Sequence, residues 1–276
     1  MSKLKNQPKP EVSCPADVRE IRLLATSFYE LQAVRIQINN RIAMLKRDYG
    51  LDLIEATTMH NNVFPRIQEA EDAIEKRARE YARQYPVFTE WIGPHVKGVA
   101  ETLTAGLIAG IRDISRFDTV SKLWKYCGVG IRADGSIQKR VKGQKVDYSP
   151  FLKTLCYKLG EQFVKIGDRG YYGLKYQEFK ADEQKKAQER GLKILPQADI
   201  DKLKDDQKAA TISEGHIHNR TKRKVAKLFL SHLWEVWRTL EKLPVRPPYV
   251  TGIKTENHPF THHRYEPPPG FEKSAD

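Results

Sequence analysis

The sequence has few cysteines and no long apolar run. Its three cysteines, Cys14, Cys127 and Cys156, are scattered and form no Cys-x-x-Cys pair, so we predict neither a disulfide framework nor a zinc site. No run approaches the ~20 apolar residues that a membrane span needs, and residues 1–15 lack the hydrophobic core of a secretory signal. We therefore expect a cytoplasmic protein with ordinary thiols and no membrane contact.

The chain is strongly basic. Its 276 residues include 48 Lys and Arg against 35 Asp and Glu, which gives a formal net charge of +13. Such an excess favours a polyanionic partner, most simply nucleic acid. The alternative is a soluble basic protein without such a ligand.

Residues 17–86 show the pattern of a coiled-coil helical arm after a Pro-containing, disordered lead-in at 1–16. A first helix over 17–50 has apolar residues at alternating steps of three and four, namely Ile21, Leu24, Phe28, Leu31, Ile38, Ile42 and Leu45. Arg35 interrupts this seam and is a candidate for fixing its register or partner. A second helix over 65–86, after a polar loop around His60, folds back on the first or pairs with a second subunit.

Acidic residues of the second helix are interpreted as a solvated face, because basic neighbours supply ion pairs along the helix. The acidic residues are Glu69, Glu71, Asp72 and Glu75. We predict no metal site in this chain.

A glycine turn precedes a predicted helix over 101–111. Backbone N–H groups at such a helix start have no partner within the helix and suit phosphate oxygens. The predicted contacts are Lys97, Gly98, Val99 and Ala100. Within the helix, Gly106 and Gly110 allow close packing, which we expect against a helix over 119–126. Trp124 is interpreted as a core residue rather than a base-stacking platform.

Two further groups of cations are predicted to contact phosphates. Residues 132–145 read as a short β-hairpin or mobile basic loop with turns at Gly135 and Gly143, and carry Arg132, Lys139, Arg140, Lys142 and Lys145. The final helix, from about His216, begins with Arg220, Lys222, Arg223 and Lys224. Its later part has an apolar stripe that should dock on the core.

Four strings occur in order within residues 91–157: Gly98-Val99-Ala100, Arg112-Asp113-Ile114-Ser115-Arg116-Phe117, Tyr126-Cys127-Gly128-Val129 and Gly135-Ser136-Ile137-Gln138-Lys139. In this order and spacing the segment resembles the carboxy-terminal domain of the insertion-sequence 110/116/902 group of transposases. Ala100 stands where that family has a second hairpin glycine, and Glu101 follows it.

The resemblance implies a helix-hairpin-helix-like DNA-binding domain over residues 87–168, preceded by an arm that joins subunits. It also implies that Ser136 is a nucleophile toward the DNA backbone. The alternative for Ser136 is a solvent-facing turn serine. The family's amino-terminal acidic, metal-dependent domain has no counterpart in this sequence, so we expect no cofactor in this chain and Mg²⁺ only with a partner catalytic subunit.

The remaining segments are expected to be peripheral. Residues 169–243 form a charged helical insertion, with helices over 174–190 and 199–210, followed by the docking helix. Residues 244–276 form a Pro-rich extended tail, in which His258, His262 and His263 are not interpreted as ligands.

The sequence thus predicts a mainly α protein with antiparallel coiled-coil helices and a DNA-binding domain. The expected function is DNA binding in transposition or site-specific recombination of a mobile element, as a homo-oligomer, with structured RNA as a second possible ligand. One alternative is a serine-dependent DNA strand-transferase that a partner chain completes. Another is an RNA-binding or oligomerisation protein.

Overall fold

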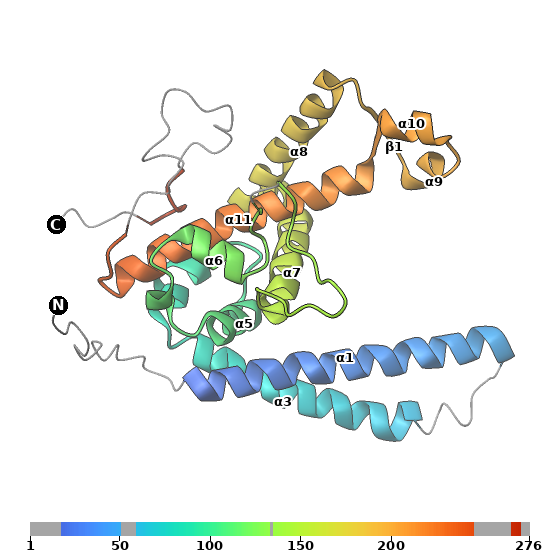
Figure 1. Cartoon of the computed structure of the whole chain (residues 1–276). Helices are drawn as coiled ribbons and strands as arrows, with labels where there is room; N and C mark the ends of the chain where they lie inside the picture. The colour runs from blue at the N-terminus through green and yellow to red at the C-terminus, as the bar shows by residue number, and fades with distance from the viewer. Residues whose placement is uncertain (1–17, 51–58, 133–134, 246–265, 272–276) are drawn as a thin grey trace.

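The computed structural model describes residues 18–50, 59–132, 135–245 and 266–271, and these are mainly helical (Figure 1). The predicted mainly α class is therefore confirmed. The lead-in at 1–16 and the three tail histidines lie outside the described residues. Across those residues, no helix combines the length and apolarity that a bilayer crossing requires.

The arm consists of α1 (Val18–Tyr49) and α3 (Phe64–Ala82), which confirms both predicted helices. They run antiparallel and project from the body (Figure 1). The seam is buried or half-buried from Ile21 to Ile42, while Leu45 is 37% exposed. Part of the expected polar loop is instead a π-helical turn at Met59–Val63.

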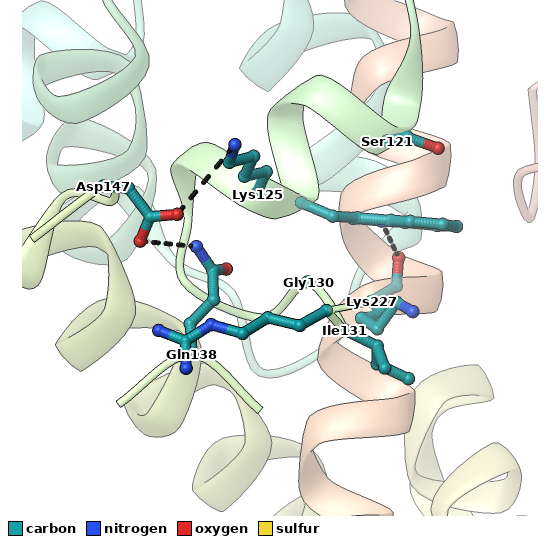
Figure 2. A pocket seen from close by; sticks show the side chains of 9 residues that line it. Ser121, Lys125, Gly130, Ile131, Gln138, Asp147 and Lys227 are labelled. Carbon is teal, nitrogen blue, oxygen red and sulfur yellow. Dashed lines mark hydrogen bonds and ion pairs between the residues drawn. The ribbon is translucent and has the colours of Figure 1, made fainter. Parts of the chain in front are cut away.

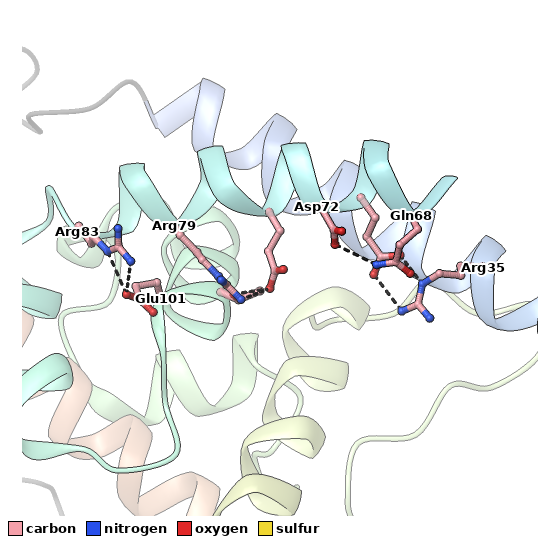
Figure 3. A network of polar contacts seen from close by, with 9 residues as sticks. Arg35, Gln68, Asp72, Arg79, Arg83 and Glu101 are labelled. Carbon is pink, nitrogen blue, oxygen red and sulfur yellow. Dashed lines mark hydrogen bonds and ion pairs between the residues drawn. The ribbon is translucent and has the colours of Figure 1, made fainter. Parts of the chain in front are cut away.

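Arg35 lies opposite Glu71 in this seam. Its Nε and Nη2 donate to the Glu71 carboxylate at 2.6 and 3.1 Å. Glu71 is only 3% exposed, so its interpretation as part of a solvated face is wrong. A buried carboxylate needs a charged partner, and Arg35 supplies it from within the same chain. Figure 3 shows this pair with Arg79–Glu75 and Arg83–Glu101 farther along α3.

Helix α5 (Glu101–Ile111) spans the predicted residues, and most of its side chains are buried. A Cβ atom added to Gly106 would lie 2.9 Å from Cδ1 of Leu155, and one added to Gly110 would lie 2.7 Å from Cγ of Leu152. The close neighbour is thus α7 (Pro150–Ile166), with α1 beside it, and not the helix over 119–126 that the sequence favoured.

Helix α6 (Val120–Tyr126) packs instead against α11 (Glu214–Leu240). Ser213 caps α11 by accepting from the His216 N–H at 3.1 Å. The predicted apolar stripe of α11 is docked on the core, with Phe229, Leu233, Trp234 and Trp237 buried. Helix α8 (Tyr171–Glu189) lies beside α11 (Figure 1).

The segment between α8 and α11 differs from the prediction. Instead of one helix over 199–210, it contains α9 (Gln197–Ile200) and α10 (Asp205–Ala209) between two short strands. β1 (Lys193–Leu195) pairs in parallel with β2 (Thr211–Ser213), and Ile194 is opposite Ile212. This pairing joins residues distant in sequence, which local charge patterns do not reveal.

Short helical turns connect the main elements: η2 (Val87–Ile92), α4 (Gly93–His95), η3 (Ile114–Arg116) and η4 (Gly167–Arg169). Part of the expected extended tail, residues 266–271, contacts the body. The Trp91 Nε1–H donates to the Pro269 carbonyl at 3.1 Å, and Glu266 pairs with Lys175 at 2.9 Å.

Candidate nucleic-acid interface

The basic loop between α6 and α7 contains two tight turns. Ile131 and Ile137 form an isolated antiparallel bridge, and the Arg132 N–H donates to the Ser136 carbonyl at 2.9 Å. Gly135 and Gly143 have φ of +78° and +79°, where glycine avoids the strain of a side chain. The bridge is the one pairing of the predicted hairpin among the described residues, and the alternative of a mobile loop stays a prediction.

The base of this loop is fixed to the body. The Gln138 side chain is 2% exposed, and its Nε2 donates to Asp147 Oδ1 at 3.1 Å. The Lys153 ammonium donates to the Gln138 carbonyl, and the Ser149 N–H donates to the Tyr126 carbonyl at 2.8 Å. The loop is therefore presented from a defined position on α6 and α7.

The five predicted loop cations project into solvent from this base. All are exposed, and none forms an ion pair with another described residue. They are Arg132, Lys139, Arg140, Lys142 and Lys145. Five cations without an ion-pair partner in the described part of so short a segment favour a positive surface that attracts polyanions.

The cations of α11 are arranged differently. Arg220 and Lys224 both pair with the buried Glu183 of α8, Arg220 at 3.1 Å. Lys222 is 4% exposed and pairs with Glu161 of α7. Carboxylates on α7 and α8 thus hold three of the four cations predicted at this helix start, and their contact with phosphates stays a prediction. Arg223 makes no ion pair with a described residue.

Farther along α11, Lys227 completes the positive region. Burial, and then the charges of Arg223 and Lys224, lower the pKa of Lys227 to about 8. Burial, Arg220 and Arg223 likewise lower the pKa of His216, and Lys139 of the loop acts in the same direction. The loop and this face of α11 thus share one positive field.

Lys227 opens into a cleft of about 530 Å³ between α6, the loop and α11 (Figure 2). Its Nζ lies 4.2 Å from the centroid of the Trp124 ring, a cation–π distance. The Trp124 Nε1–H donates to the Lys227 carbonyl at 3.0 Å. Trp124 is therefore half-buried at the wall of a cleft, and not wholly a core residue.

The Gly98 turn lies elsewhere. Gly98 has φ of +92°, and a Cβ there would lie 2.7 Å from Cγ1 of Ile166, at the last turn of α7. The basic loop adjoins the first turn of α7, about 25 Å away along that helix of 17 residues. The structure does not bring these two groups of predicted contacts together.

The start of α5 also has its own anion. The pKa of Glu101 is lowered, first by a hydrogen bond from the backbone N–H of Glu101 to its own carboxylate and then by a hydrogen bond from Arg83. Arg83 Nη2 is 2.8 Å from its carboxylate. Val99 is buried, while Lys97 and Ala100 are exposed. Glu101 therefore neutralises the turn that was predicted to receive phosphate.

The string at residues 112–117 has a structural role. The Asp113 carboxylate accepts from the Ser115 N–H at 2.7 Å, which caps η3. Trp234 Nε1 donates to the Phe117 carbonyl at 2.6 Å, and Arg238 Nη1 donates to the same oxygen at 3.1 Å. This string thus forms the turn on which α11 is held.

Ser136 is exposed in the hairpin between Arg132 and Lys139. Within the described ranges, no group of three or more His, Cys, Asp or Glu residues is placed to hold a metal ion. The Tyr176 hydroxyl and His218 Nδ1 share a hydrogen bond of 2.5 Å. The nucleophilic role of Ser136 stays a prediction.

Sequence reasoning missed the cleft itself. Lys227 lies on α11 just beyond the four predicted contacts and was not predicted as one, although a lysine between the buried Val225 and Phe229 was a signal. Gln138 was hidden in the alternation of the basic run. Lys227 belongs to none of the four strings and Gln138 was not assigned a role within its string, so only the packing of α6 on α11 reveals their proximity. No protein-family model matches this chain, and no curated protein matches it.

Proposed function

We propose that this chain binds DNA through a cationic surface made of the loop at 131–147 and the adjoining face of α11. The observation that carries the proposal is the excess positive charge. Five loop cations have no acidic partner among the described residues, and burial together with the neighbouring cations lowers the pKa of Lys227. Positive charge without a counter-ion within the protein favours phosphate, because binding then releases condensed counter-ions from the DNA.

We further propose that the DNA belongs to a mobile element and that the chain acts in transposition or recombination with a separate catalytic subunit. The ordered strings at 98–139 support this proposal. Phosphate contacts position a protein on DNA without reading its sequence. The chain would therefore hold DNA of many sequences, while the partner supplies the metal-dependent chemistry. Structured RNA is the alternative ligand, to be compared with DNA in the same binding assay.

The test compares two variants that each lose four cations. The loop variant replaces Lys139, Arg140, Lys142 and Lys145 with Ala; the control replaces Lys193, Lys202, Lys204 and Lys208, which are exposed near the far end of α8. Fluorescence anisotropy with labelled duplex DNA should show that the loop variant lowers the slope of log affinity against log salt by roughly 3 to 4. The control should change it much less. Equal losses would refute the assigned surface.

A second function, serine-dependent DNA strand transfer completed by a partner chain, is favoured by the position of Ser136 between two exposed cations. A serine hydroxyl becomes an effective nucleophile only when a base or metal withdraws its proton. Incubating the chain and its partner with DNA and Mg²⁺ should then yield a covalent protein–DNA adduct that Ser136→Ala abolishes. That variant should still bind DNA nearly as tightly as the wild type.

A further inference from the structure

The cleft beside Lys227 has the size and composition of a ligand site. Its volume of about 530 Å³ falls within the roughly 300–1,000 Å³ typical of small-molecule pockets. Three elements enclose it: α6 provides Trp124 and Lys125, the hairpin provides Ile131 and Arg132, and α11 provides Lys227 (Figure 2). It thus combines an aromatic wall, an aliphatic wall and three cations.

One buried acceptor in this cleft has no donor. Gln138 Oε1 is buried without a hydrogen-bond partner, although Gln138 Nε2 donates to Asp147. Gln138 is only 2% exposed. A buried oxygen without a hydrogen-bond donor is rare in folded proteins. Gly130 lies beside it, and a Cβ there would be 3.1 Å from Oε1. Gln138 lines the cleft, so a small N–H donor there would satisfy this oxygen if the amide turned to expose it.

The cations of the cleft need an anion. Lys227 has no ion pair with a described residue, and Lys125 has only a loose pair with Asp147 at 3.9 Å. Arg132 lines the cleft and is exposed. A phosphate that enters here would meet an ammonium and a guanidinium, which form strong charge-assisted hydrogen bonds.

We propose that the cleft receives a single unpaired nucleotide of a DNA strand. Its phosphate contacts Lys227 and Arg132, and its base lies along Trp124 and Ile131 with an amino group donating to Gln138 Oε1. A paired base cannot reach a buried acceptor without leaving the stack. An inorganic phosphate would leave that acceptor and the apolar walls unused. The inference rests on the proposed DNA binding and adds that the surface selects distorted or single-stranded DNA.

The experiment uses three labelled duplexes of one sequence: fully paired, with one bulged adenosine, and with an abasic bulge. All three carry the phosphate backbone, but only the second offers an unpaired amino group. Wild-type protein should bind the adenosine bulge roughly tenfold more tightly than the other two, the gain expected from one base stacked and hydrogen-bonded in a cleft.

Two substitutions test the assigned contacts. Lys227→Met keeps the aliphatic stem on Trp124 but removes the charge, and Gln138→Met removes the acceptor. Gln138→Met should reduce the preference for the adenosine bulge over the abasic bulge to less than about threefold, whereas Lys227→Met should weaken the binding of both bulged duplexes. Lys122→Ala, an exposed residue of α6 outside the cleft, is the matched control and should keep the full preference. Thermal unfolding of each variant verifies its fold.

The outcomes separate this inference from the DNA-binding proposal. If wild-type protein binds all three duplexes equally and the loop variant binds none, the surface is correct and the nucleotide site is refuted. Retention of the full preference by folded Gln138→Met also refutes it. If wild-type protein binds no DNA even at low salt, both proposals fail together.

Discussion

His232 of α11 is a buried histidine whose two ring nitrogens both have partners. Its Nε2 lies 3.0 Å from the Glu266 carbonyl, which can only accept, so Nε2 carries the proton. Its Nδ1 then accepts from the Tyr172 hydroxyl at 2.7 Å. Burial lowers the pKa of His232 to about 4. A second proton on Nδ1 would oppose the Tyr172 hydroxyl and place a charge in the core.

The stability of the protein should therefore fall as the pH drops from 6.5 toward 4. Between these pH values, His232 takes up a proton in the unfolded state but stays neutral in the folded state. The free energy of unfolding therefore falls by up to roughly 3 kcal/mol. Urea unfolding at pH 7, 6 and 5 measures the loss, and His232→Gln should show a flatter dependence. An unchanged slope in His232→Gln would contradict the assignment.

At the scale of elements, the tight contact between α5 and α7 depends on glycine. Replacing Gly110 with Ala would bring a Cβ within 2.7 Å of Cγ of Leu152, whose side chain is fully buried. Gly110→Ala should destabilise the protein by about 1–3 kcal/mol, as overpacking does. Gly215→Ala, in α11 with nothing within 4 Å, should be neutral or stabilising by about 0.5–1 kcal/mol. Chemical denaturation compares them, and equal effects would refute the packing argument.

The same elements show what sequence alone can predict. The ends of α5 and the start of α7 follow from local signals, such as Ser149, whose hydroxyl accepts from the Leu152 N–H, before Pro150. Which helix meets the glycines of α5 is not local, and the sequence favoured the wrong neighbour. Lys222 also looked exposed on its own helix, because Glu161, its partner, lies on another.

At the scale of the whole molecule, positive charge is unevenly distributed. Carboxylates on α3, α7 and α8 neutralise many cations of the arm and of α11, but not those of the loop at 131–147. The seam of the arm is filled within one chain by contacts such as Arg35–Glu71. If the arm joins subunits, it must do so through its outer face, because the inner faces of its two helices already pack on each other. The joining of subunits stays a prediction.

The separation of the two predicted phosphate sites by α7 leads to a final prediction. Arg140→Ala should lower the salt slope of DNA binding by about 0.9, the value for one lost phosphate contact. Lys97→Ala should leave the slope unchanged, because Glu101 occupies the start of α5 beside it and the loop lies about 25 Å away along α7. Both residues are exposed, so neither substitution should disturb the fold. Anisotropy titrations at several salt concentrations measure both slopes. A reduction for Lys97→Ala as large as that for Arg140→Ala would mean that DNA spans both ends of α7, and that Glu101 moves away from the helix start to admit a phosphate.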